Sequence, residues 1–237
     1  MGPSSWLTNM TTYWKDRYNV LAEKFADAPL RQVERTVNGQ EVSDVQMNLA
    51  IDAVVQSLNL QLSDCVADLC CGNGLITRAV APRVRAVTGV DFSEGLIHYA
   101  RQHSVADNIH YEIADVSRLP SKFFHGMNKV YLRDSVSCLD TESLSRLLHA
   151  ISQSGTVEKF HIGGVPDAGK LSVYYDTDEK MAYYQKLKAE GIPHIGTWWG
   201  RDEFIGLVEA QGLTASICEQ SEQLTCAYYR FDCLIGR

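Results

Sequence analysis

Several features that mark particular protein classes are missing from this 237-residue chain. No apolar run approaches the ~18 residues of a membrane-spanning helix, and the N-terminus lacks a basic-then-apolar signal. The seven cysteines show no C-x-x-C pair, so neither a disulfide framework nor a zinc ribbon is indicated. No basic stripe offsets the net charge of −7, which argues against binding through phosphates. We therefore expect a cytoplasmic protein with free thiols that binds neither membrane nor nucleic acid.

What is present is an ordinary globular composition, with 45% hydrophobic and 22% charged residues. The length predicts one domain, or one domain plus an elaboration, and such a chain buries an ample core. Nothing in the sequence decides between a monomer and a homodimer.

Strands and helices alternate along most of the chain. Apolar segments predict strands at 65–70, 86–91, 109–114, 128–132 and 156–162, and helical patterns follow most of them. This alternation predicts an α/β fold whose parallel sheet binds ligands at the carboxyl ends of its strands. Two further strands, at 213–219 and 226–235, suit an antiparallel hairpin at the end of the chain.

Two helix starts can be predicted from their caps. Ser43 and Gln46 form a capping-box pattern before a helix that reaches Leu58. Thr141 is predicted to cap a helix with an apolar stripe through Leu144 and Ile151.

A glycine turn lies between the first two predicted strands. Residues 68–74 read Asp-Leu-Cys-Cys-Gly-Asn-Gly, and the next strand ends on Asp91. A nucleotide ribose needs a carboxylate at about this distance from a glycine turn. Thr77 stands where a dinucleotide fingerprint requires Gly or Ala, which disfavours a nucleotide-dependent oxidoreductase. Asp68 before the turn suits a cationic ligand, such as an ammonium or sulfonium group.

These segments resemble the motifs of class I S-adenosylmethionine-dependent methyltransferases. Residues 68–74 resemble the first motif, 90–93 the second, and 113–116 with the following Leu-Pro the third. The spacings of 23 and 24 residues between Asp68, Asp91 and Asp115 support the resemblance, which covers roughly residues 45–165. One departure is Cys70, which replaces the first glycine of the motif and crowds the side of the turn that faces the methionine part.

The resemblance implies a Rossmann-like fold with a seven-stranded, mostly parallel sheet, an antiparallel C-terminal strand and S-adenosylmethionine as cofactor, released as S-adenosylhomocysteine. It implies a ribose contact for Asp91, an adenine contact for Asp115 and stacking or core packing for Phe92. The full predicted set of cofactor-binding residues is Trp14, Arg17, Asp68, Cys70, Gly72, Asn73, Gly74, Asp91, Phe92, Ser93, Ala114, Asp115, Val116 and Leu132.

Two segments stand outside the regular alternation. Residues 1–42 carry an aromatic cluster and are predicted to be a helical segment, in which Trp14 and Arg17 either form a lid or serve helix packing. Residues 43–237 would then form the methyltransferase domain. Within it, 165–200 is predicted to be a helical insertion with a loop on the substrate side.

Catalytic candidates lie at the ends of the fourth and fifth predicted strands. Asp134 is a predicted substrate or cofactor contact and, less favourably, a general base. His161 either faces the substrate or is a satisfied core histidine. Cys70 and Cys71 are interpreted as apolar filler, because adjacent cysteines chelate one ion poorly and no histidine is near. No metal is predicted.

A second, weaker resemblance involves short motifs around residues 30–39, 196–198, 219–220 and 229–232. They are similar to bacterial methyltransferases associated with surface-polysaccharide biosynthesis, which implies a sugar or a nucleotide-activated small group as acceptor. The sequence therefore predicts O-methylation of a small hydrophilic acceptor. The alternative from another class is a non-catalytic S-adenosylmethionine-binding regulatory module.

Overall fold

The computed structural model describes residues 4–237, and side chains from residue 10 onward, so residues 1–3 of the predicted N-terminal segment lie outside it. A seven-stranded sheet forms its centre, in the order β5-β4-β3-β6-β7-β9-β8. The strands are β3 (Cys65–Leu69), β4 (Ala86–Asp91), β5 (Ile109–Ile113), β6 (Lys129–Arg133), β7 (Lys159–Pro166), β8 (Thr214–Glu219) and β9 (Arg230–Gly236).

Strands β3 to β7 pair in parallel, whereas β9 is antiparallel to both β7 and β8. This arrangement confirms the predicted fold class, including the antiparallel C-terminal strand. The predicted boundaries of the first four strands agree with the structure to within about one residue, which is the usual uncertainty of strand ends.

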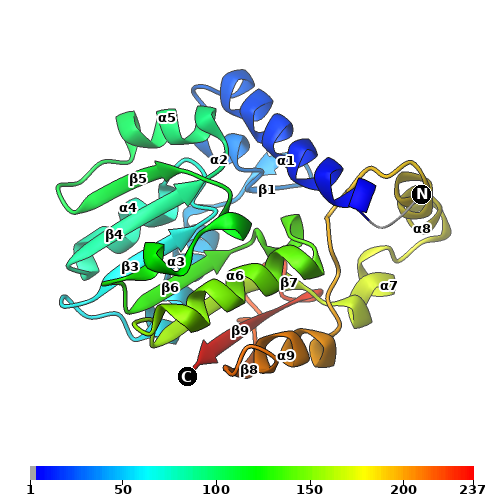
Figure 1. Ribbon diagram of the computed structural model, residues 1–237. Helices are drawn as coiled ribbons and strands as arrows, with labels where there is room; N and C mark the ends of the chain where they lie inside the picture. The colour runs from blue at the N-terminus through cyan, green and yellow to red at the C-terminus, as the bar shows by residue number, and fades with distance from the viewer. Residues whose placement is uncertain (1–3) are drawn as a thin grey trace.

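Helices cover both faces of the sheet (Figure 1). They are α1 (Ser4–Lys24), α2 (Pro29–Gln32), α3 (Asp44–Leu58), α4 (Leu75–Val80), α5 (Glu94–His103), α6 (Thr141–Ser154), α7 (Leu171–Tyr174), α8 (Asp178–Ala189) and α9 (Arg201–Glu209). A two-stranded hairpin, β1 (Thr36–Val37) with β2 (Gln40–Glu41), follows α2. None of the described helices is long and apolar enough to cross a membrane.

The pleat of the strands divides the core into two layers. Ala67 of β3 belongs to the larger cluster, which packs under α6 and α9, while its neighbour Val66 belongs to the cluster under α3 and α4. Successive side chains of a strand point to opposite faces, so a buried central strand must be apolar at every position. In Figure 1, α6 and α9 lie in front of the sheet.

The predicted caps were partly right. Ser43 accepts the N–H of Gln46 at 3.4 Å, as the capping box requires. The Gln46 side chain does not turn back, however, and instead contacts Gln223 and Thr225 of the loop before β9. The prediction for Thr141 was wrong, because Asp140 caps α6 by accepting the N–H of Ser143 at 2.7 Å.

The insertion after the fifth strand of the alternation begins slightly later than predicted. Val165 and Pro166 still belong to β7, and α7, α8 and a loop follow. The loop returns to the sheet through Trp199, whose N–H donates to the carbonyl of Pro166 at 2.8 Å. The insertion is therefore anchored at both ends beside β7.

Gly74 begins α4 with φ +77°, and a Cβ there would lie 2.2 Å from the Tyr111 hydroxyl. We predict that Gly74→Ala destabilises the protein by at least about 2 kcal/mol, because backbone strain and collision add. Gly155→Ala is the matched control, since Gly155 has φ +74° with nothing within 4 Å. It should lose only about 1 kcal/mol in urea unfolding. Equal losses would show that the contact with Tyr111 relaxes at no cost.

Candidate functional site

The carboxyl ends of β3, β4 and β6 meet at one edge of the sheet, where a cavity of about 510 Å³ opens. This volume is within the range of small-molecule sites. Its walls come from α1, from residues 33–38, from the turn after β3, from the ends of β4 and β6, and from residues 224–230. The cavity lies where open α/β sheets bind ligands.

Asp91 holds the turn after β3 against the end of β4. Its carboxylate accepts the N–H of Gly72 at 2.9 Å and that of Ser93 at 2.8 Å. Burial nevertheless raises its pKa to about 6, because these bonds only partly replace lost hydration. Asp91 lines the cavity, as predicted.

Asp68 lies in the same wall and is 3% exposed. Thr77 donates its hydroxyl to this carboxylate at 2.5 Å, which explains why a threonine rather than a glycine stands there. Burial raises the pKa of Asp68 to about 7 despite that bond. A cation beside it would restore the ionised form.

The turn itself needs an unusual backbone. Cys70 has φ +57°, a left-handed conformation that favours glycine, and Gly72 also has φ +57°. Cys70 thus adopts a backbone conformation that favours glycine, at a cost in strain. Cys70, Cys71 and Asn73 line the cavity, whereas Gly74 packs on Tyr111 instead.

Helix α1 closes one side of the cavity. Asn19 accepts hydrogen bonds from the Ser93 hydroxyl at 2.8 Å and from the N–H of Gly95 at 3.2 Å, which fixes α1 on the start of α5. Figure 1 shows α1 crossing the top of the view from α5 towards the insertion. Trp14 and Arg17, both predicted cofactor contacts, line the cavity from this helix.

Two polar links continue this closure. Arg17 forms an ion pair with Glu34, and the amide of Asn73 donates to Pro29 and Gln32, at 2.8 Å each. The indole N–H of Trp14 is buried without a partner. A buried donor without a partner is costly, so a ligand acceptor at this point would be favourable.

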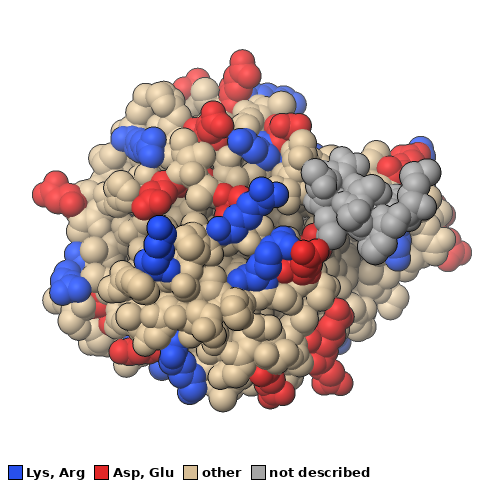
Figure 2. Space-filling model, in the orientation of Figure 1, with Lys and Arg blue, Asp and Glu red and all other residues tan. Residues whose placement is uncertain are grey.

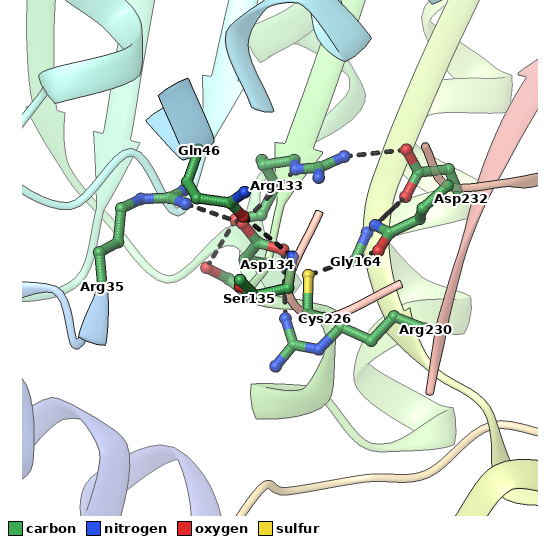
Figure 3. Close-up of polar contacts among 11 residues, drawn as sticks. Arg35, Gln46, Arg133, Asp134, Ser135, Gly164, Cys226, Arg230 and Asp232 are labelled. Atoms are coloured by element: carbon green, nitrogen blue, oxygen red, sulfur yellow. Dashed lines mark hydrogen bonds and ion pairs between the residues drawn. The ribbon is translucent and has the colours of Figure 1, made fainter. Parts of the chain in front are cut away.

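Asp134 follows β6 and lies between three guanidinium groups (Figure 3). Its carboxylate is 3.0 Å from Arg35, 3.1 Å from Arg230 and 3.4 Å from Arg133. Burial alone would raise the pKa of Asp134. The three positive charges outweigh burial and hold this pKa well below its ordinary value, so the carboxylate is a weak base.

The backbone around Asp134 is shaped for this position. Asp134 has φ +60°, and a Cβ on Gly164 would lie 1.9 Å from its carboxylate. Aspartate tolerates the left-handed region better than most residues. Gly164 therefore provides the space that the carboxylate occupies.

His161 does not line the cavity. It is 1% exposed within β7, and burial lowers its pKa to about 4. Neither ring nitrogen has a hydrogen-bond partner. The structure gives no support for the substrate-facing alternative, because a buried neutral imidazole off the cavity cannot reach an acceptor, and we propose no catalytic role for it.

Several other predicted contacts also lie off the cavity. Asp115 accepts the N–H of Ser117 at 2.9 Å and its hydroxyl at 2.7 Å, so it caps its own helical turn. Val116 and Leu132 belong to the larger core cluster, and Ala114 packs against it. Phe92 does line the cavity, whereas Ser93 caps α5 behind it. The residues of the third motif therefore do not line this cavity, and the adenine contact of Asp115 stays a prediction.

Three groups of cavity residues were not predicted. Tyr18 lies on α1, Arg35 precedes the β1–β2 hairpin, and Tyr174, Tyr228 and Arg230 come from the insertion and the end of the chain. Tyr18 belonged to the aromatic cluster, and Arg230 to the short motif at 229–232. In the described residues, no group of three or more His, Cys, Asp or Glu is arranged to hold a metal ion.

Residues 66–154 match the family described as methyltransferase domain. A ubiquinone biosynthesis O-methyltransferase of Coxiella burnetii is 43% identical over 56 residues, which span 23% of this chain and 24% of the relative. An uncharacterized RNA methyltransferase of Lactococcus lactis subsp. lactis is 34% identical over 82 residues, 33% of this chain and 16% of the relative. The chain thus matches a quarter or less of the length of these relatives.

Among solved structures, magnesium protoporphyrin IX methyltransferase from Synechocystis PCC 6803, with S-adenosylhomocysteine bound, is similar over 96% of this chain and 99% of that chain. The TM-score is 0.66 at 17% identity. At this identity the likeness shows the fold. The chain therefore shares the fold of this methyltransferase structure, and its residues 66–154 match a methyltransferase domain.

The raised pKa of Asp68, about 7, predicts a pH-dependent stability of the ligand-free protein. The folded state retains a proton that the unfolded state, with a pKa of ~3.9, has lost. Stability should therefore fall as pH rises from about 4 to about 7 and be level above. Asp68→Asn cannot titrate, so its decline should be smaller by up to about 1.4 kcal/mol per pH unit. Urea unfolding at several pH values tests this, and parallel curves would contradict it.

Proposed function

We propose that the protein transfers a methyl group from S-adenosylmethionine to an oxygen of a small hydrophilic acceptor. One observation carries this proposal: a single cavity joins the glycine turn and Asp91 to the end of β6. The region of the cavity at the glycine turn and Asp91 suits the nucleoside and the amino-acid end of the cofactor. The region at the end of β6 leaves room for an acceptor beside the cofactor. Similar solved structures that contain bound S-adenosylmethionine or S-adenosylhomocysteine support the choice of cofactor.

The reaction is an in-line displacement at the sulfonium methyl. An oxygen lone pair forms the new O–CH₃ bond, the C–S bond breaks, and its electron pair stays on the sulfur of S-adenosylhomocysteine. A hydroxyl acceptor then releases its proton to water, whereas an anionic oxygen has none to lose. Holding the oxygen about 3 Å from the methyl supplies much of the rate by position alone. The weak basicity of Asp134 fits a site that works by positioning.

The acceptor class rests on short motifs. Those at 30–39, 196–198, 219–220 and 229–232 are similar to methyltransferases associated with surface-polysaccharide biosynthesis, which favours a sugar or a nucleotide-activated small group. The relatives are named for RNA and ubiquinone biosynthesis, but their matches cover short segments. Lys and Arg are interspersed with Asp and Glu on the face in Figure 2, which favours a small molecule over a polyanion.

Two measurements test the proposed function. Titration calorimetry should show binding of S-adenosylhomocysteine and no binding of NAD. Incubation with methyl-labelled S-adenosylmethionine and a panel of sugars and sugar nucleotides should then label an acceptor. Cofactor binding without transfer to any member of a broad metabolite extract would favour the non-catalytic regulatory module instead.

Asp91→Asn should lower the affinity for S-adenosylhomocysteine at least about tenfold, since charge-assisted hydrogen bonds to the ribose contribute ~1.5–3 kcal/mol each. The matched control is Asp115→Asn, which changes a carboxylate that caps its own turn outside the cavity. Calorimetry should find its affinity unchanged. An equal loss in the control would restore the adenine contact predicted for Asp115.

Trp14→Phe should weaken S-adenosylhomocysteine binding by about two- to tenfold, because the variant lacks the indole N–H that can donate to the ligand. Trp199→Phe removes another buried indole N–H without a partner, but in the core rather than in the cavity. That control should lower the unfolding temperature without changing the affinity. If both variants bind like the wild type, Trp14 serves helix packing only.

A further inference from the structure

The end of the cavity beside β6 contains more positive than negative charge. Arg35, Arg133 and Arg230 face two carboxylates, those of Asp134 and Asp232. In the described part of the chain these arginines form ion pairs with no third carboxylate. We call these five residues the arginine cluster (Figure 3). Its three guanidinium groups and two carboxylates leave the cluster with one positive charge in excess.

The Asp232 carboxylate lies outside the cavity lining and already accepts hydrogen bonds from three donors. Asp232 accepts Arg133 at 2.8 Å, the N–H of Gly164 at 2.8 Å and the amide of Gln220 at 2.6 Å. Asp134 is shared by Arg35, Arg230 and, at 3.4 Å, Arg133. Two carboxylates therefore leave the charge of one guanidinium group unbalanced.

Among the neighbouring titratable groups, only Asp68 can supply negative charge: it lines the cavity, interacts with Arg35, and has a pKa that burial raises to about 7. The others do not supply the missing charge. Burial raises the pKa of Tyr229 to about 12 and also raises that of Cys226, so both are neutral at physiological pH. His161 is neutral as well, since its pKa lies near 4. Arg17 is paired with Glu34 and adds no net charge.

Some guanidinium N–H groups are also unused. Arg133 is 4% exposed, lines the cavity, and has no hydrogen-bond partner at Nη2. Arg230 has none at Nε. Buried charges and donors are costly unless a partner binds them, and a guanidinium fork matches planar or tetrahedral oxyanions.

Aromatic rings form the adjoining wall. Tyr174 lies 4.6 Å from Tyr229 between ring centroids, and the Arg230 guanidinium lies 5.0 Å from the Tyr229 ring. Tyr174, Tyr228 and Tyr229 all line the cavity. Such faces stack on the ring of a small molecule while the arginines bind its charged group.

We propose that the acceptor carries an anionic group, a carboxylate or a phosphate, which binds the arginine cluster through Arg230 and Arg35. The Asp134 carboxylate lies between these guanidinium groups and acts as their counterion. The identification of this ligand as the methyl acceptor rests on the proposed function. Binding of the anion can be measured without any methyl transfer.

Three matched hexoses test the site: glucose 6-phosphate, glucuronate and glucose, with inorganic phosphate as the smallest probe. Calorimetry with protein saturated with S-adenosylhomocysteine should show at least one anionic probe binding about tenfold or more tighter than glucose. The stronger of the two hexose anions identifies phosphate or carboxylate as the natural group. No anion-dependent affinity up to about 10 mM would overturn the proposal.

Variants locate the binding. Arg230→Gln and Arg35→Gln should each lower the affinity for the anionic probe about tenfold and leave the affinity for glucose unchanged. Arg35 precedes the hairpin outside the sheet, so its variant stays informative if Arg230→Gln folds poorly. Asp134→Asn should tighten anion binding, because the competing carboxylate is removed. Arg118→Gln removes an 81% exposed guanidinium and should change nothing. Equal effects of Arg118→Gln and Arg230→Gln would reveal nonspecific charge attraction and overturn the assignment.

The same experiment separates the two proposals. If the wild type fails to bind S-adenosylhomocysteine, the proposed function is wrong, while the anion titrations can still be made on the ligand-free protein. If S-adenosylhomocysteine binds and the anionic probes do not, only the anionic acceptor is wrong.

Discussion

The carboxylate of Asp91 connects the parts of the molecule that form the cavity. It accepts the N–H of Gly72, which holds the turn after β3, and the N–H of Ser93, which starts α5. Ser93 in turn donates its hydroxyl to Asn19 of α1. The position of α1, with Trp14 against the cavity, therefore depends on a buried carboxylate more than 70 residues along the chain.

The fold could be predicted because its signals are local. A buried parallel strand is apolar throughout, and a turn that needs left-handed backbone selects glycine or accepts strain, as at Cys70. Errors arose where two neighbouring residues offer the same chemistry. Asp140 and Thr141 can both cap a helix, and the side chain that reaches the N–H of Ser143 is decided by tertiary packing.

The site was predicted less completely, because its acceptor side is built from distant segments. The pair between Arg35 and Asp134 joins residues 99 positions apart, and no periodicity or spacing reports such a contact. Asp115 was assigned to the ligand by motif, whereas its carboxylate is used by its own turn. His161 was expected at the end of a strand at 156–162, but β7 runs on to Pro166, so His161 lies within the strand and is buried off the cavity. An error of four residues in a strand end is enough to remove a side chain from the carboxyl edge of the sheet.

The cavity also crosses the limits of the family match. The glycine turn, Asp91 and Asp134 lie within the matched segment, residues 66–154, while Arg35, Tyr174 and Arg230 lie outside it. The match therefore carries no information about the wall that these three residues form. Relatives that share only the matched segment can keep one chemistry and differ in every contact to the molecule being modified. Names inherited through that segment describe a reaction class and carry little information about its target.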